Sequence, residues 1–192
     1  MQSTFVRSYA DPTILPKEGL NQVAFFSRSN AGKSSLINSL TNKKDLAHTS
    51  AKPGRTKLIN IFDVAGQFHL VDLPGYGFAK GSKEDRDQLF ALIDGYVRTS
   101  ELLCLAIVII DCRIGPTEDD LQLIGLLQDL RIPFFIVANK IDKLSRTELE
   151  KALAQLRAQF EGITIFPHSA VTSAGRGELY DAIVRAVKSD TI

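Results

Sequence analysis

Short apolar segments alternate with amphipathic segments along this sequence from about residue 20, and this alternation limits the possible folds more than any other feature. Strands that alternate with helices form a mostly parallel sheet with helices on both faces. A hairpin around Ala65-Gly66 adds an antiparallel strand, because glycine permits the turn. The sequence therefore predicts an α/β fold with a six-stranded, mostly parallel sheet and one antiparallel strand. Strands are expected at 22–26, 57–64, 67–73, 103–111, 132–139 and 163–167, and helices at 34–40, 82–98, from 117 onward, 145–160 and 178–188.

The chain of 192 residues has the length of one domain, and its composition of 44% hydrophobic and 23% charged residues is that of a globular protein. That composition excludes a collagen-like chain and a wholly disordered one. Residues 1–19 are polar and contain two prolines, so we expect an N-terminal arm there, followed by a single domain at 20–192.

The longest uninterrupted apolar run, Leu102–Ile110, has nine residues, whereas a membrane helix needs about 20. The N-terminus lacks the apolar core of a secretory signal. Cys104 and Cys112 stand at the two ends of one expected strand, roughly 26 Å apart, and cannot form a disulfide with each other. We therefore expect a cytoplasmic protein without a membrane partner.

Positive charge is concentrated in residues 43–57, although the net charge of the whole chain is only +1. The basic residues of this segment face a single acidic residue, Asp45. Such a segment suits phosphate or RNA, and it equally suits a solvated loop. The basic residues are Lys43, Lys44, Lys52, Arg55 and Lys57.

Residues 27–34 follow an expected strand and open an expected helix, and seven of the eight match the phosphate-loop pattern G-x-x-x-x-G-K-[ST]. The exception is Ser27, which replaces the first glycine. Successive backbone N–H groups and the helix dipole attract a phosphate at such a loop. Lys33 is placed to reach the β- and γ-phosphates, and the Ser34 hydroxyl suits Mg²⁺. The alternative, a Gly-Lys helix start without a ligand, fits this strand–loop–helix context poorly.

A second motif, Asn139-Lys140-Ile141-Asp142, follows another apolar strand and indicates guanine. A carboxylate at Asp142 can accept hydrogen bonds from the N1–H and 2-amino groups of guanine, and adenine has neither donor. Asn139 can tie this motif to the phosphate loop, and the Lys140 stem can lie over the base. Backbone N–H groups at Ser169-Ala170 can meet the guanine O6.

Two further segments lie where a nucleotide switch is expected. Asp72-Leu73-Pro74-Gly75 ends a strand, so that Asp72 can hold Mg²⁺ through water and the Gly75 N–H can meet a γ-phosphate. Thr56 lies between the phosphate loop and that strand, and its hydroxyl can complete the Mg²⁺ shell when a triphosphate is present. An order–disorder switch would follow.

Together these motifs resemble the EngB (YihA/YsxC) family of bacterial ribosome-assembly GTPases, in the TrmE–Era–EngA–EngB–septin group. The resemblance rests on SRSNAGKSSLIN (27–38), TSAKPGRTKLIN (49–60), VDLPGYGFAK (71–80), NKID (139–142) and HSA (168–170). It implies a monomeric Ras-like P-loop domain, Mg²⁺-dependent binding and hydrolysis of GTP, association with the large ribosomal subunit and its rRNA, and a role in cell division and septation.

The resemblance also implies the site residues. Nucleotide contacts are expected from Ser27, Arg28, Ser29, Asn30, Ala31, Gly32, Lys33, Ser34, Ser35, Gly54, Arg55, Thr56, Lys57, Leu58, Asp72, Leu73, Pro74, Gly75, Asn139, Lys140, Ile141, Asp142, His168, Ser169 and Ala170. Metal contacts are expected from Ser34, Thr56 and Asp72, and catalytic roles from Lys33, Thr56 and Gly75.

Hydrolysis is expected to be slow in the isolated protein, because Tyr76 stands where Ras-like enzymes usually place the glutamine that orients water. The resemblance to relatives with asparagine at this place of the loop implies that Asn30 holds a potassium ion between the β- and γ-phosphates, and the alternative is that Asn30 only caps the loop locally. Two other functions remain open: a GTP-occupied scaffold with negligible turnover, which Tyr76 favours, and a small P-loop ATPase or kinase, which Asp142 disfavours.

Overall fold

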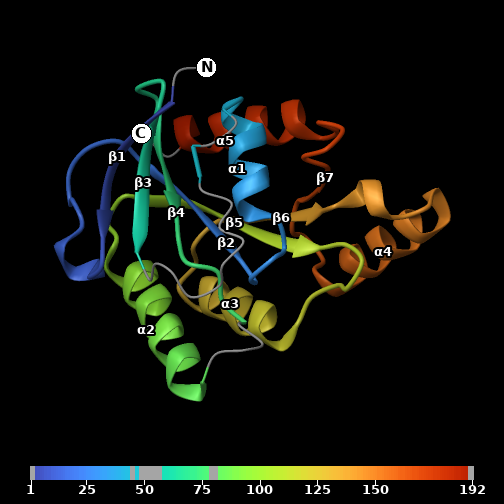
Figure 1. The fold of residues 1–192 in the computed structure, drawn as a ribbon, viewed down its shortest axis with the longest axis horizontal. Coiled ribbons are helices and arrows are strands. Elements are labelled where there is room, and N and C mark those ends of the chain that lie inside the picture. The colour runs from blue at the N-terminus through green and yellow to red at the C-terminus, as the bar shows by residue number, and fades with distance from the viewer. Residues whose placement is uncertain (1–2, 44–45, 48–57, 78–81, 190–192) are drawn as a thin grey trace.

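A computed structural model describes residues 3–43, 46–47, 58–77 and 82–189. Its centre is a seven-stranded sheet with the strand order β1-β3-β4-β2-β5-β6-β7, and helices cover both of its faces (Figure 1). Only β3 runs against the other strands of this sheet. The strands are β1 (Ser3–Tyr9), β2 (Gln22–Ser27), β3 (Ile59–Val64), β4 (Phe68–Asp72), β5 (Leu103–Asp111), β6 (Phe134–Asn139) and β7 (Ile165–His168).

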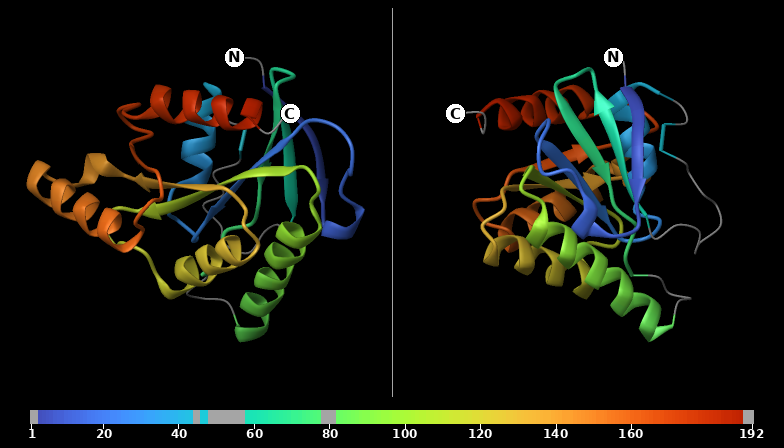
Figure 2. Two further views of the ribbon diagram at one scale, coloured as in Figure 1. Left: turned by 180° about the vertical axis from the view of Figure 1, so that it is seen from behind. Right: turned by 90° about the vertical axis from the view of Figure 1, so that its left-hand side faces the viewer.

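The helices form two separate layers, which the two views of Figure 2 show on opposite sides of the sheet. One layer contains α1 and α5, and the other contains α2, α3 and α4. The α-helices are α1 (Lys33–Thr41), α2 (Lys83–Thr99), α3 (Glu118–Asp129), α4 (Arg146–Gln159) and α5 (Arg176–Ser189), and the short 3-10 helices are η1 (Pro12–Ile14) and η2 (Ile141–Lys143).

The interior strand β5 explains the long apolar run in the sequence. All nine of its residues are buried, since β2 and β6 flank it and both faces are covered. Alternate residues point to opposite faces of a strand. Ile107 and Ile109 therefore join the core beneath α1 and α5, while Val108 and Ile110 join the core beneath α2, α3 and α4.

Three helices begin with side-chain caps. The N-cap hydroxyls of Ser82, Thr117 and Ser145 each accept a hydrogen bond from the backbone N–H three residues later. The carboxylate of that later residue in turn accepts a hydrogen bond from the backbone N–H of the N-cap residue. The predicted strand at 103–111 has the observed bounds, and the other predicted elements differ from the observed ones mainly at their ends.

The sheet has one strand more than the six expected. Seven of the residues assigned to the N-terminal arm form β1, which pairs antiparallel with β3. The Phe5 ring packs edge-on against Phe62, with their centroids 5.7 Å apart, and Lys43 Nζ donates a hydrogen bond to the Ser3 carbonyl. Without β1, the backbone groups along one side of β3 would lack strand partners, which is a reason for nearby chain to pair there.

The predicted α/β class is confirmed, and the carboxyl ends of β2, β4, β5, β6 and β7 lie at one edge of the sheet, where open α/β sheets bind ligands.

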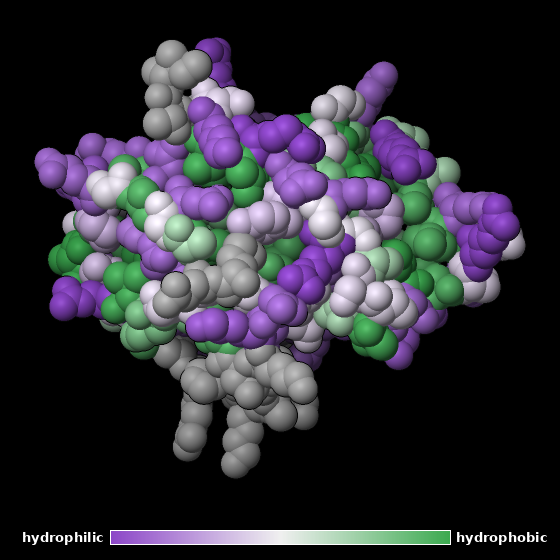
Figure 3. All heavy atoms as spheres, turned by 90° about the horizontal axis from the view of Figure 1, so that it is seen from above, coloured by the Kyte–Doolittle hydropathy of each residue, from purple (hydrophilic) through white to green (hydrophobic). Residues whose placement is uncertain are grey.

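On the face shown in Figure 3, hydrophilic and hydrophobic side chains are interspersed. Within the described ranges, none of the helices is both long enough and apolar enough to cross a bilayer.

Candidate functional site

The predicted phosphate loop connects β2 to α1 with two residues in the left-handed backbone region. Asn30 has φ 67°, and Gly32, the N-cap of α1, has φ 99°. A Cβ at Gly32 would lie 2.4 Å from Asn139 Nδ2, so only glycine allows the second motif to approach this closely. Ser27 belongs to β2 and has the extended backbone of a strand, which any L-residue adopts. The missing first glycine therefore imposes no backbone strain at that position.

The segment containing Gly75 lies directly against this loop. Ser29 N donates to Tyr76 O over 2.7 Å, and Tyr76 N donates to Ser27 O over 3.1 Å. A Cβ at Gly75 would touch Ser27 O and the Ser29 backbone, each at 3.4 Å. The fold thus brings together two segments that are separated by more than forty residues in the sequence, with the Gly75 backbone beside the loop.

Lys33 and Asp72 form an ion pair between the start of α1 and the end of β4. The Lys33 side chain is 11% exposed and the Asp72 side chain 12% exposed, so this pair is largely removed from solvent. The residue expected to bind phosphate and the residue expected to face the metal therefore neutralise each other here. Both remain at the edge where the ligand is expected.

The Tyr76 side chain is fully buried and faces away from solvent. Its hydroxyl donates to Asp120 Oδ1 over 2.7 Å, and its ring packs 5.8 Å from that of Phe90. Burial, followed by the neighbouring Asp120 carboxylate, raises the pKa of Tyr76 well above its usual value. Asp120 also belongs to the capping box of α3. Tyr76 therefore anchors its segment to α3, and its phenol is not placed to orient a water molecule.

The predicted guanine motif is joined to the phosphate loop, as expected from the sequence. Asn139 ends β6 and is 2% exposed, and its Nδ2 donates to Ala31 O over 2.9 Å. Lys140 Nζ donates to Asn30 O and also lies 2.9 Å from Asp111 Oδ2. Two adjacent residues of the motif thus hold two adjacent carbonyls of the loop.

The carboxylate expected to recognise the base is held by the loop that follows β7. Ser169 Oγ donates to Asp142 Oδ1 over 2.7 Å, and this bond is the largest cause that lowers the pKa of Asp142. The same Oγ accepts from the backbone N–H groups of Val171 and Thr172, each at 3.2 Å. Asp142 is therefore ionised at neutral pH and can act as an acceptor. Of the other residues expected near the base, Ile141 lies in η2, His168 ends β7, and Ala170 is half-buried.

Asp111 is a site residue that the sequence did not predict. Its side chain is 2% exposed at the end of β5, and it accepts from Arg113 Nη2 at 2.6 Å, Arg113 Nε at 2.9 Å and Lys140 Nζ at 2.9 Å. Burial alone would raise the pKa of Asp111, but the bonds from Arg113 and Lys140 outweigh it and lower the pKa to about 2. The signal in the sequence was a carboxylate that ends the long apolar run.

Part of the predicted site lies outside the described residues. The expected nucleotide contacts outside the described residues are Gly54, Arg55, Thr56 and Lys57, and the basic residues outside them include Lys44 and Lys52. Leu58 is described, and it is half-buried just before β3.

In the described residues no three His, Cys, Asp or Glu side chains form a group able to hold a metal. The predicted magnesium contacts Ser34 and Asp72 offer one hydroxyl and one carboxylate. That hard-oxygen set fits Mg²⁺, which usually takes its other ligands from phosphates and water.

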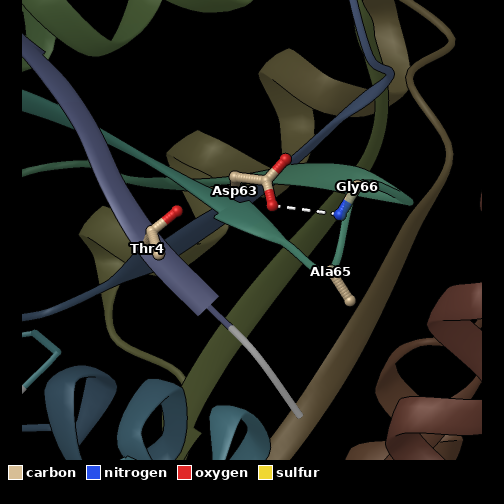
Figure 4. A pocket seen from close by; sticks show the side chains of 4 residues that line it. All are labelled: Thr4, Asp63, Ala65 and Gly66. Atoms are coloured by element: carbon tan, nitrogen blue, oxygen red, sulfur yellow. Dashed lines mark hydrogen bonds between the residues drawn. The ribbon is translucent and has the colours of Figure 1, made fainter.

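A hollow lined by Thr4, Asp63, Ala65 and Gly66 lies at the β3–β4 turn (Figure 4). Because β4 begins at this turn, the hollow is at the opposite edge of the sheet from the phosphate loop. Its carboxylate, Asp63, already accepts from the Gly66 N–H over 3.0 Å. Nothing in its lining matches the chemistry predicted from the motifs.

Known families match the chain over most of its length. The family model described as 50S ribosome-binding GTPase matches residues 22–140, and that of the elongation factor Tu GTP binding domain matches residues 93–189. The probable GTP-binding protein EngB of Solibacter usitatus is 41% identical over 189 residues, which cover 98% of each chain. The EngB of Bacillus subtilis is 38% identical over 192 residues, which cover 97% of each.

Solved structures share the fold. A crystal structure of a probable GTP-binding protein engB has a TM-score of 0.74 at 24% identity, and the match covers 88% of this chain and 99% of that one. The structure of Era with MgGDPNP and part of 16S ribosomal RNA has a TM-score of 0.68 at 23% identity, and the match covers 88% of this chain and 57% of that one.

Tyr76→Phe should separate anchoring from catalysis. Removing the hydroxyl leaves Asp120 without one hydrogen-bond donor, so we expect the free energy of unfolding to fall by about 1 kcal/mol. We expect the single-turnover rate of GTP hydrolysis to stay within about threefold of the wild-type rate, because a residue that acts in proton transfer contributes about 10²-fold or more to the rate. Urea unfolding and rapid-quench assays measure the two quantities. A hundredfold slower turnover would show that Tyr76 acts in the chemistry.

Proposed function

The chain belongs to the EngB family of GTP-binding proteins, and on this basis we propose that it is a slow, Mg²⁺-dependent GTPase switch acting in assembly of the large ribosomal subunit. Binding of guanine nucleotide and hydrolysis of GTP are the activities of this family. The proposal also includes finer assignments. The protein acts in the cytoplasm as a monomer whose single domain spans 20–192, it contacts the large ribosomal subunit and its rRNA, and it is required for normal cell division.

The hydrogen bond from Asn139 to the Ala31 carbonyl is the observation that carries the nucleotide assignment. It fixes the distance between a loop suited to phosphate and a carboxylate suited to guanine. A nucleotide has its phosphates and its base a fixed number of bonds apart, so a site for it needs both ends at a set separation. Asp142 then supplies the preference for guanine, because adenine would leave this carboxylate without a donor.

Nucleotide binding would change the partner of Lys33. In the structure its ammonium is neutralised by Asp72. A bound diphosphate would offer Lys33 a stronger anion, and Asp72 and the Ser34 hydroxyl would then be available to hold Mg²⁺. The metal would supply charge neutralisation at the β- and γ-phosphates. Lys33, Asp72 and Gly75 would thereby respond together to the presence of the γ-phosphate.

Slow hydrolysis is supported by the placement of Tyr76. Its phenol is bound to Asp120 in the core, so the position that carries glutamine in many Ras-like enzymes provides no water-orienting group here. The same observation favours the second candidate function, a GTP-occupied scaffold that releases little phosphate. The two differ only in turnover, and the ribosomal experiment below separates them.

The ribosomal assignment is supported by the family and by charge. The matching family model carries the description 50S ribosome-binding, and Era, a protein of similar fold, has been crystallised with ribosomal RNA. The basic segment at 43–57 lies between α1 and β3 in the sequence, and charge of this kind favours contact with RNA phosphates.

Asp142→Asn should exchange guanine for xanthine. The amide oxygen can still accept from Ser169, while the new NH₂ group faces the base, so a donor replaces an acceptor. We expect GDP affinity to fall by about 10²-fold or more and XDP affinity to rise, as titrations with GDP, XDP and ADP would measure. Asp129→Asn, at the far end of α3, is the matched control. Unchanged GDP preference in Asp142→Asn would refute the guanine assignment.

Potassium should accelerate turnover if Asn30 holds a cation beside the phosphates, as we propose. We expect GTP hydrolysis in potassium buffer to exceed that in sodium buffer by about tenfold or more. Asn30→Gly keeps the left-handed backbone at φ 67° but removes the side chain, so it should lose this difference while retaining GDP. Equal rates for the wild type in both buffers would refute the cation site.

Large ribosomal subunits should bind the protein in a nucleotide-dependent way. We expect co-sedimentation with purified large subunits in a non-hydrolysable GTP analogue and about tenfold weaker binding in GDP. Neutralising Lys44 and Lys52 should weaken binding and its salt dependence, whereas neutralising Lys151 and Arg157 on α4 should not. Binding independent of nucleotide would refute the switch. Phosphate release that stays absent in single-turnover assays with subunits would favour the scaffold.

A further inference from the structure

A chain of polar groups, buried at His168 and Asn139, connects α1, β7, β6 and the phosphate loop. Ser39 Oγ lies 3.5 Å from His168 Nε2, His168 Nδ1 lies 2.9 Å from Asn139 Oδ1, and Asn139 Nδ2 donates to Ala31 O over 2.9 Å. His168 is 0% exposed and Asn139 is 2% exposed. Water therefore cannot readily replace a lost partner of these two side chains.

The hydrogen-bonding capacity of each group determines the arrangement. The Ala31 carbonyl only accepts, so the NH₂ group of Asn139 must face it, and Asn139 Oδ1 then faces His168. An amide oxygen also only accepts, so His168 Nδ1 must carry a proton. Burial lowers the pKa of His168 to about 4, which leaves one ring proton at neutral pH. Nε2 is therefore the acceptor that faces Ser39.

We propose that His168 is a positioning residue: its Nδ1–H holds the Asn139 amide in the one orientation that joins the guanine motif to the phosphate loop, and thereby sets how long the nucleotide is retained. The sequence suggested that His168 contacts the nucleotide. Its buried ring instead uses both nitrogens on protein partners. This inference rests on the guanine-nucleotide site proposed above.

Loss of the Nδ1–H donor would loosen the join. Asn139 Oδ1 would stay buried without a donor, and rotation of the amide would bring its oxygen against the Ala31 carbonyl, where two acceptors repel. A buried acceptor without a partner costs enough free energy to change a rate constant by about tenfold or more. The phosphate loop and the base-binding motif would then separate more easily, and nucleotide would leave sooner.

Two substitutions at position 168 isolate the donor. His168→Leu places a carbon where Nδ1 lies, so it keeps bulk and removes the donor. His168→Asn places an NH₂ group at the same position along the side chain and so restores a donor. We expect a fluorescent GDP analogue to dissociate about tenfold faster from His168→Leu than from wild type, and the asparagine variant to recover most of this loss in stopped-flow measurements.

The double variant distinguishes positioning from a general loss of stability. Once Asn139→Ala has removed the amide, we expect His168→Leu to have no further effect on GDP dissociation, because its only route to the nucleotide is through Asn139. Ser39→Ala should change dissociation by less than about twofold, since the 3.5 Å contact to Nε2 is weak. Additive effects of the two substitutions on dissociation would refute the proposal.

A nitrogen-15 spectrum of the imidazole gives a readout independent of nucleotide. The Nδ1–H tautomer of His168 supports the proposal, and the Nε2–H tautomer overturns it, even if His168→Leu fails to fold. If wild-type protein fails to bind GDP, the proposed function is wrong. If wild type binds GDP and folded His168→Leu releases it at the wild-type rate, the function stands and only this inference is wrong.

Discussion

The contact between the Asn139 amide and the Ala31 carbonyl is the interaction on which the site depends. The sheet brings β2 and β6 to the same edge, on either side of β5, but strand pairing alone leaves the loops beyond them free to diverge. The hydrogen bond from Asn139 to the Ala31 carbonyl holds these two loops together, and the Lys140 ammonium adds a second bond to the neighbouring Asn30 carbonyl. The bond is possible only because position 32 has no side chain.

Around this contact the charged residues are arranged in pairs. Lys33 faces Asp72, Lys140 faces Asp111, and Asp142 receives a hydroxyl from Ser169. Isolated charges at these buried or partly buried positions would be costly, and their partners remove most of that cost. The pairs differ in purpose. In the proposed function Lys140 would keep Asp111 as its partner, whereas Lys33 and Asp72 would separate so that phosphate and metal can bind.

Sequence patterns were sufficient for features that depend on local chemistry. The three capped helices and the buried strand 103–111 follow from residue type and spacing alone. The bond between Asn139 and the phosphate loop joins residues 108 positions apart, and two sequence motifs indicate it. Distant contacts that no motif marks were not predictable. Asp111 reads as a strand end until Lys140 is placed beside it, and the role of Tyr76 depends on Asp120, which is 44 residues away. The sequence assigns the segment Ser3–Tyr9 to an arm, because its pairing partners in β3, from Ile59 to Val64, lie at least 50 residues away.

The additional strand has a consequence for how the molecule behaves in concentrated solution. Among the described residues β1 is the outermost strand on the side of β3, and an edge strand can serve as a template for a neighbouring copy. The register of β1 shifts between Phe5 and Arg7, which interrupts the regular ladder at its middle. This irregularity, with a charged side chain beside it, opposes edge-to-edge aggregation of the protein at a position where a flat strand would promote it.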